Sequence, residues 1–281
     1  MNLQGIQQPE PSHELRIIID IALHAGDILL KHFKQNIAVE YKNSDDFDPV
    51  STADKESDEY IRNELKKQFP NDFILSEEND AIPTDCSKRI WMVDPLDGTK
   101  DFLKGKDGFA IHIGLLENGM PTLGVVYAPA RKRLFWAQKG QGAYEKTEEN
   151  YRRIHVSTLT DLNEVRIITR SPGSDKRELD AVVEKMPRKE SIHDSGIKVP
   201  KIACGEAELH INTNLRASKW DTLAPQVILE EAGGCIADIC GNELDYAQPE
   251  LKWKNSYIAA SNRSLLEQVY PMVKEFYKID S

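Results

Sequence analysis

The fold of this chain is decided by residues 91–99, which read Trp91-Met92-Val93-Asp94-Pro95-Leu96-Asp97-Gly98-Thr99. The apolar run 90–93 predicts a buried strand, and it leads directly into the carboxylate of Asp94. After a turn at Pro95, Asp97 supplies a second carboxylate. Carboxylates beside a buried strand are unfavourable unless they are paired or bind a metal ion. The stretch therefore predicts a carboxylate site at a strand end or, as the alternative, an ordinary turn that closes the strand.

Three more acidic residues stand where other predicted elements begin or end. Asp54 precedes a predicted helix, Glu77 follows an apolar run, and Asp221 precedes an amphipathic run. Taken singly, Asp54 and Asp221 suit helix N-caps and Glu77 suits a solvated loop. Taken together with residues 94–97, they form an oxygen-only set suited to a hard cation such as Mg²⁺. Zinc is not expected, because the histidines are scattered and the cysteines form no motif.

Working outward, the polar segment 145–150 is the predicted boundary between two halves, 1–150 and 151–281. The mixture of elements fits an α/β or α+β layered sandwich. Hydrophobic periodicity predicts helices at 13–33, 55–69, 175–186, 197–205, 222–232 and 264–277, and strands at 39–42, 90–93, 109–116, 123–127, 133–137, 143–144, 165–169, 208–211 and 256–260.

The composition excludes several classes of partner. The 281 residues carry a formal net charge of −10, which argues against binding to a nucleic-acid polymer or an anionic membrane. No apolar run approaches the roughly 20 residues of a membrane span, and no secretory signal is evident, so the expected compartment is the cytoplasm. An acidic protein that binds a phosphate anion must reverse the field locally, and bound divalent cations are the simplest way to do so.

The acidic motifs together resemble those of the inositol monophosphatase-like superfamily of Mg²⁺-dependent, Li⁺-sensitive phosphatases. The similarity runs from about residue 15 to residue 260. The resemblance implies a layered αβαβα sandwich, as in inositol monophosphatase and fructose-1,6-bisphosphatase, with the active site between the halves, and a homodimer. The matching motifs are Asp48-Pro49-Val50-Ser51-Thr52-Ala53-Asp54, Ser76-Glu77-Glu78, Asp94-Pro95-Leu96-Asp97-Gly98-Thr99, Trp220-Asp221-Thr222-Leu223-Ala224-Pro225 and Glu230-Glu231-Ala232-Gly233-Gly234.

The resemblance also implies a metal site that draws on both halves. Most ligands would come from residues 1–150, while Asp221 and part of the substrate pocket would come from residues 151–281. About two or three Mg²⁺ ions are expected, with Mn²⁺ as a possible substitute. The implied metal ligands are the side chains of Glu77, Asp94, Asp97 and Asp221 and the carbonyl of Leu96.

The remaining implied roles concern water and the substrate, a small phosphorylated molecule. Asp54 and Thr99 would orient and deprotonate the attacking water, as hydroxyl-to-carboxylate contact allows. Gly98 and Thr99 would offer backbone N–H groups to the phosphate, and Asp221 would also contact the substrate. Because this set is intact, a catalytically silent binding protein is the least favoured hypothesis.

Two lysines bear on the substrate. Lys100 belongs to a Lys-Asp-Phe extension that resembles the 3′(2′),5′-bisphosphate nucleotidase branch, where it could pair with a second phosphate; a solvated loop lysine is the alternative. Lys198 ends the segment 194–198, which lies where nucleotidases often carry Gly-Ser-x-x-Lys in contact with the sugar or the second phosphate. The match of Asp194-Ser195-Gly196-Ile197-Lys198 to that segment is partial.

The predicted reaction is therefore hydrolysis of adenosine 3′,5′-bisphosphate to AMP and phosphate. The alternative is an inositol monophosphatase or a broad sugar-phosphate phosphatase. Ser76, where many inositol phosphatases have glycine, favours the nucleotidase branch. Pro172 favours the alternative, because nucleotidases commonly have histidine in the corresponding Ser-Arg-Ser-His segment. Among the histidines none is predicted to be catalytic, and His112 is expected to be a structural residue packed in a sheet.

Overall fold

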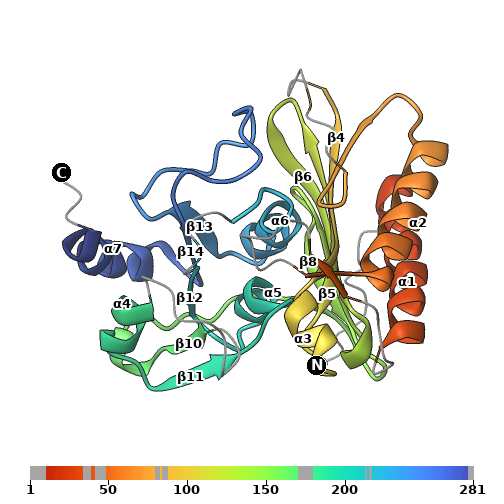
Figure 1. The fold of residues 1–281 in the computed structure, drawn as a ribbon. Coiled ribbons are helices and arrows are strands. Elements are labelled where there is room, and N and C mark those ends of the chain that lie inside the picture. The colour runs from red at the N-terminus through yellow and green to blue at the C-terminus, as the bar shows by residue number, and fades with distance from the viewer. Residues whose placement is uncertain are drawn as a thin grey trace, which may run out of the picture.

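The computed structural model describes residues 11–33, 39–41, 49–79, 83, 88–169, 180–212, 214 and 217–277, with the backbone alone for 39–41, 49–51 and 276–277. Helices and sheets alternate in five layers, helix–sheet–helix–sheet–helix (Figure 1). The predicted αβαβα sandwich is confirmed. None of the described helices is long and apolar enough to cross a membrane.

The first sheet has seven strands in the order in which they follow along the chain. All neighbours are antiparallel except β3 and β4, which are parallel. Residues 147–150 of the polar segment connect β8 to β9 at a solvent-exposed turn, so the predicted division at residue 150 falls inside this sheet. The strands are β3 (Phe73–Ser76), β4 (Ile90–Asp97), β5 (Ala110–Glu117), β6 (Met120–Ala128), β7 (Arg133–Gln138), β8 (Gly142–Lys146) and β9 (Tyr151–Ile154).

The second sheet has five strands in the order β11-β10-β12-β14-β13. Strand β10 runs parallel to both of its neighbours, and β14 runs antiparallel to both of its own. The strands are β10 (Arg166–Thr169), β11 (Glu190–His193), β12 (Leu209–Ile211), β13 (Cys235–Asp238) and β14 (Tyr257–Ala260). A separate antiparallel pair joins β1 (Val39–Tyr41) to β2 (Pro49–Ser51).

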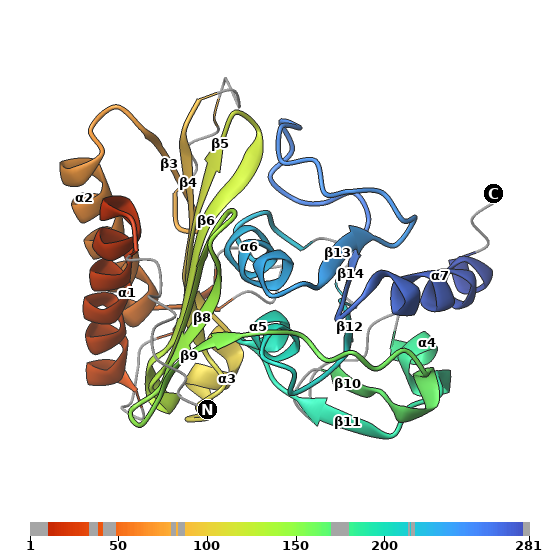
Figure 2. The ribbon, with the colours of Figure 1, turned by 180° about the vertical axis from the view of Figure 1, so that it is seen from behind.

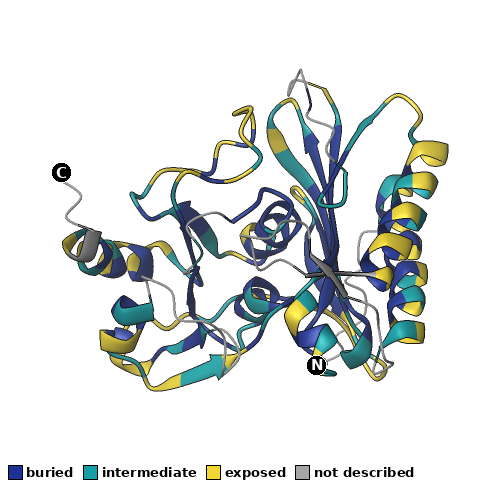
Figure 3. Cartoon of the chain, in the orientation of Figure 1, coloured by how far each residue is buried: buried dark blue, intermediate teal, exposed yellow. Residues whose placement is uncertain are grey.

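The helices fill the three remaining layers, as the view from behind also shows (Figure 2). Helices α1 (His13–His32) and α2 (Thr52–Gln68) cover the outer face of the first sheet, while α4 (Asp180–Lys185) and α7 (Arg263–Tyr277) cover that of the second. Helices α5 (Lys198–Ala203) and α6 (Leu223–Glu231) lie between the sheets and are mostly buried (Figure 3). The five-residue helix α3 (Thr99–Leu103) follows β4, and single 3-10 turns occur at η1 (Pro129–Arg131) and η2 (Leu162–Glu164).

Strand alternation explains how the first sheet serves both helix layers. In β5, Ile111 and Ile113 point into the core shared with α1, whereas Ala110 and Leu116 join the core shared with α6. The backbones of sheet and helix come close together at Gly124 of β6. A β-carbon there would lie 2.4 Å from the carbonyl oxygen of Ala224 in α6, so only glycine lets the helix pack this tightly.

Most predicted elements are present, with shifted ends. Helix α2 begins at Thr52, so Asp54 lies in its first turn and is not the N-cap that was one interpretation of the sequence. Strands β9 and β11 were missed because they are short sheet edges with exposed residues, which lack a buried alternating pattern. Part of the predicted helix at 175–186, together with Pro172, lies outside the described residues.

Candidate active site

A β-bulge in β4 brings the carboxylates of Asp94 and Asp97 to one face of the sheet. Asp94 lies opposite His112 of β5, and Asp97 lies opposite Ala110, so two residues of β4 face one of β5. In a regular strand, positions three apart point to opposite faces. The extra residue corrects this, and both carboxylates take the side of Ala110, which faces the inner helices.

Glu77 comes to the same place along the neighbouring strand. Ser76, the last residue of β3, pairs with Val93 in parallel register, and the backbone N–H of Glu77 donates to the carbonyl of Val93 at 3.2 Å. Continuing this register sets Glu77 beside Asp94. The acid that follows β3 therefore lies next to an acid inside β4.

Asp221 arrives from the C-terminal part of the chain, two residues before α6. Its Oδ2 accepts a hydrogen bond from the backbone N–H of Ser218 at 3.0 Å. The N-cap position of α6 is held by Thr222, so the interpretation of Asp221 as an N-cap is wrong. The tight packing of α6 on the first sheet carries Asp221 toward the other carboxylates.

The pKa of Asp94 shows how closely these four acids gather. Burial raises this pKa well above its ordinary value, and the charges of Glu77, Asp97 and Asp221 raise it further. A hydrogen bond from the backbone N–H of Leu96 to Asp94 Oδ1, 2.9 Å long, only partly opposes the rise. The cluster therefore concentrates negative charge that a cation would relieve.

The donor chemistry of this cluster suits a hard cation, because carboxylate oxygens are the ligands that Mg²⁺ prefers. Within the described part of the chain, no three His, Cys, Asp or Glu side chains already stand in an arrangement that could hold an ion. The residues fit a metal in kind and in charge, without fixing the number of ions.

The other predicted groups lie on the turn after β4 and on α2. Gly98 has a φ of 91°, which favours glycine, and Thr99 begins α3. The hydroxyl of Thr99 donates to the carbonyl of Leu96 at 3.0 Å. Asp54 is 3% exposed in the first turn of α2, and that helix is tied to β4 by a hydrogen bond from Ser57 Oγ to the carbonyl of Pro95, 3.1 Å long.

The two lysines expected at the substrate differ in position. Lys198 Nζ lies 3.7 Å from Asp97 Oδ2 and also donates a hydrogen bond to the carbonyl of Ser195. Lys100 is exposed on α3. The structure thus brings Lys198 to the carboxylate cluster and leaves Lys100 on the surface beside it.

His112 is buried in β5, as expected of a structural residue. Its Nε2 lies 2.8 Å from the carbonyl oxygen of Gly196 and 3.8 Å from Asp97 Oδ2. Burial lowers its pKa, although Asp97 acts in the opposite direction. The ring joins β5 to the segment before α5.

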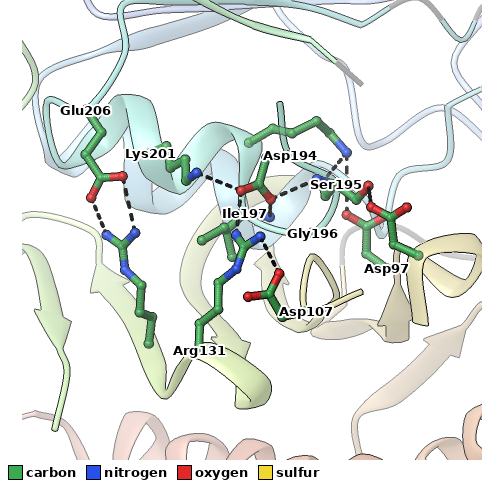
Figure 4. A network of polar contacts seen from close by, with 12 residues as sticks. Asp97, Asp107, Arg131, Asp194, Ser195, Gly196, Ile197, Lys201 and Glu206 are labelled. Carbon is green, nitrogen blue, oxygen red and sulfur yellow. Dashed lines mark hydrogen bonds and ion pairs between the residues drawn. The ribbon is translucent and has the colours of Figure 1, made fainter. Parts of the chain in front are cut away.

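No pattern in the sequence predicted the polar network around Asp194, next to the active-site lysine Lys198. Figure 4 shows Asp194 between Arg131 and Lys201, and the Oγ of the next residue, Ser195, donates a hydrogen bond to Asp101 Oδ2 at 2.7 Å. Arg131 Nη1 and Asp194 Oδ2 are 2.5 Å apart although 63 positions separate them in the chain. Only the partial Gly-Ser-x-x-Lys match pointed to this segment, and it did not point to Arg131.

Comparison with protein families matches residues 10–276 to the inositol monophosphatase family. The chain belongs to this family. Its members are generally metal-dependent phosphatases that act on small phosphorylated substrates, so the protein is a phosphatase hydrolase.

Individual relatives carry different names at similar distances. An inositol monophosphatase from Mesembryanthemum crystallinum is 34% identical over 258 residues, 88% of this chain and 93% of the relative. The 3′(2′),5′-bisphosphate nucleotidase CysQ from Salmonella typhimurium is 32% identical over 239 residues, 84% of this chain and 95% of its own. The solved structure of the extragenic suppressor protein suhB from Bartonella henselae superimposes with a TM-score of 0.79 at 28% identity, covering 94% of this chain and 99% of that one.

Proposed function

We propose that the protein is a Mg²⁺-dependent 3′(2′),5′-bisphosphate nucleotidase that converts adenosine 3′,5′-bisphosphate to AMP and phosphate. The observation that carries this proposal is the position of Lys198, whose ammonium group lies 3.7 Å from Asp97 Oδ2 at the edge of the carboxylate cluster. In this proposal the lysine offers a point charge to a second phosphate, the one that is not hydrolysed. A bisphosphate supplies that second group, whereas an inositol monophosphate does not.

In this proposal the carboxylate cluster holds the metal. Glu77, Asp94, Asp97 and Asp221, with the carbonyl of Leu96, would bind Mg²⁺. When bound, such ions neutralise phosphoryl charge and make a coordinated water more acidic. The remaining work of phosphoryl transfer is positioning, which the chain's own groups perform.

The residues that would position water and phosphate lie on α2 and at the start of α3. Thr99 would exchange its present acceptor, the Leu96 carbonyl, for Asp54, and the pair would orient the water and take its proton. Gly98 and Thr99 would direct backbone N–H groups at the phosphate, since the first N–H groups of a helix have no acceptor within that helix. Asp221 would contact the substrate from the α6 side.

The test compares two substrates in parallel. Phosphate release from adenosine 3′,5′-bisphosphate and from inositol 1-phosphate is measured at matched concentrations with Mg²⁺, and again with EDTA. The proposal expects a kcat/KM at least about tenfold higher for the nucleotide, about 1.4 kcal/mol in transition-state stabilisation, and no release in EDTA. Release from the inositol ester alone would refute the nucleotidase assignment.

The runner-up is an inositol monophosphatase or a broad sugar-phosphate phosphatase that uses the same cluster. It is favoured by Pro172, which replaces the histidine common in nucleotidases, and by the 34% identity to the plant inositol monophosphatase. Lys198→Met discriminates the two. It should raise KM for the bisphosphate and leave KM for the inositol ester unchanged if Lys198 binds a second phosphate.

A further inference from the structure

Asp194 is a buried carboxylate that the proposed reaction does not use. Its side chain is fully buried and lies 2.5 Å from Arg131 Nη1 and 2.8 Å from Lys201 Nζ, both reaching its Oδ2. Lys201 belongs to α5, while Arg131 ends η1 and so belongs to the first sheet's side of the molecule. One carboxylate therefore bridges the two sides.

The other oxygen of Asp194 shapes the chain that follows. Oδ1 accepts hydrogen bonds from the backbone N–H of Ser195 at 2.8 Å and of Ile197 at 3.3 Å. We call residues 194–198 the arm. Because the same side chain folds the arm and fastens it to Arg131, loss of its charge would loosen both connections together.

The arm lies directly on the turn that follows β4 (Figure 4). Ser195 Oγ donates to Asp101 Oδ2 at 2.7 Å, and the backbone N–H of Gly196 donates to the carbonyl of Gly108 at 2.9 Å. A β-carbon on Gly98 would lie 3.2 Å from Cβ of Ser195 and 2.8 Å from the carbonyl oxygen of Gly108, so arm and turn are in close contact. The position of Lys198 follows from that of the arm.

We infer that Asp194 is a positioning residue: through Arg131 and Lys201 it holds the arm against the turn after β4 and so sets the ammonium group of Lys198 at the active site. This rests on the proposed function insofar as Lys198 contacts the substrate.

The matched control is Glu208, a second fully buried carboxylate paired with an arginine. It accepts hydrogen bonds from the backbone N–H of Arg166 at 2.7 Å and from its Nη2 at 2.5 Å, in the second sheet. Asp194→Asn and Glu208→Gln each remove one buried charge and keep the shape of the side chain. Both should lower the midpoint of thermal unfolding, because each removes the buried charged partner of a partly buried arginine; Arg131 keeps only its contact with the exposed Asp107, 3.1 Å away.

Kinetics with adenosine 3′,5′-bisphosphate separate positioning from stability. Asp194→Asn should raise KM about tenfold with kcat changed less than about twofold, while Glu208→Gln leaves both unchanged. In a double-mutant cycle, Asp194→Asn should add almost nothing to Lys198→Met, because both act through the same ammonium group. An equal KM in Asp194→Asn and Glu208→Gln would overturn the inference. So would a double variant whose increase in KM is the product of the increases in Asp194→Asn and Lys198→Met.

Hydrogen exchange tests the arm without any substrate. The amides of residues 195–198 should exchange at least about tenfold faster in Asp194→Asn than in wild type, and at the wild-type rate in Glu208→Gln. Unchanged protection in Asp194→Asn would refute positioning whatever the enzyme hydrolyses. Faster exchange together with a wild-type KM in Lys198→Met would keep the positioning of the arm and refute the proposed role of Lys198.

Discussion

Gly124→Ala tests whether the packing of α6 on the first sheet fixes Asp221. The new β-carbon would lie 2.4 Å from the carbonyl oxygen of Ala224, and real β-carbons essentially never come closer than 3.0 Å. The contact must therefore open by about 0.6 Å, and overpacking of this kind costs about 1–3 kcal/mol of unfolding free energy. The clashing atom belongs to a helix backbone, so it cannot swing aside as a side chain does.

The displacement of α6 should also displace Asp221 in the active site. Asp221 precedes the clashing residue by less than one helical turn and moves with it. A misplacement of about 1 Å can cost about a hundredfold in rate, so a shift of about 0.6 Å predicts a kcat/KM lower by about tenfold. The assay is Mg²⁺-dependent phosphate release on the better substrate, at a temperature well below unfolding of every variant.

Leu29→Ala is the control for lost stability. Leu29 is fully buried in α1, on the opposite face of the first sheet, and truncating it should cost about 2–5 kcal/mol, at least as much as Gly124→Ala. It should keep its kcat/KM because α1 does not carry a residue of the site. Wild-type kcat/KM in Gly124→Ala, or an equal loss in Leu29→Ala, would refute the argument that α6 packing places Asp221.

Three further predictions concern charge. Asp94→Asn should abolish phosphate release yet raise the unfolding temperature in EDTA, because burial and its acidic neighbours raise the pKa of Asp94 and make its charge unfavourable; a lower unfolding temperature would contradict this. Burial opposes ionisation of Asp194, but Arg131 and Lys201 outweigh it and lower its pKa. The extra stability of wild type over Asp194→Asn should therefore be complete above pH 3.8, the ordinary pKa, and vanish as the pH falls through the lowered pKa of the folded protein. Urea unfolding at several pH values checks this, and a stability difference that does not change with pH would contradict it. Li⁺ and excess Ca²⁺ should inhibit phosphate release, since Li⁺ lacks the divalent charge and Ca²⁺ accepts looser coordination; full activity in Li⁺ at about 50 mM would count against the carboxylate site.

The gathering of the acids could be predicted from the sequence because each follows or precedes an element with a clear apolar pattern. Glu77 follows β3 and Asp94 lies inside β4, and the parallel pairing of these two strands sets them side by side. The β-bulge could not be predicted in the same way. Pro95 indicates a turn, whereas in the structure β4 continues through it to Asp97 with one extra residue. That extra residue decides the face on which Asp97 lies.

The contacts between the two sheets and their helices could not be predicted from the sequence, for a different reason. Arg131 and Asp194 meet because η1 lies against the segment before α5 in the folded chain, and no periodicity in either segment indicates the other. The same holds for Gly124 and Ala224, whose contact depends on how α6 crosses the first sheet. Local hydrophobic patterns specify helices and strands, whereas the packing of the whole core decides which residues of different layers meet.

A chain with a net charge of −10 that acts on an anion depends on where its few inward cations are placed. Lys198 enters the site from the same inner helix layer as Asp221, and both face carboxylates that belong to the first sheet. Packing of that layer on the sheet therefore places one carboxylate and one ammonium group at the site together. It follows that Gly124 and Asp194, neither of which has a role in the chemistry, act on the site in the same manner: they set positions, one for the carboxylate of Asp221 and one for the ammonium group of Lys198.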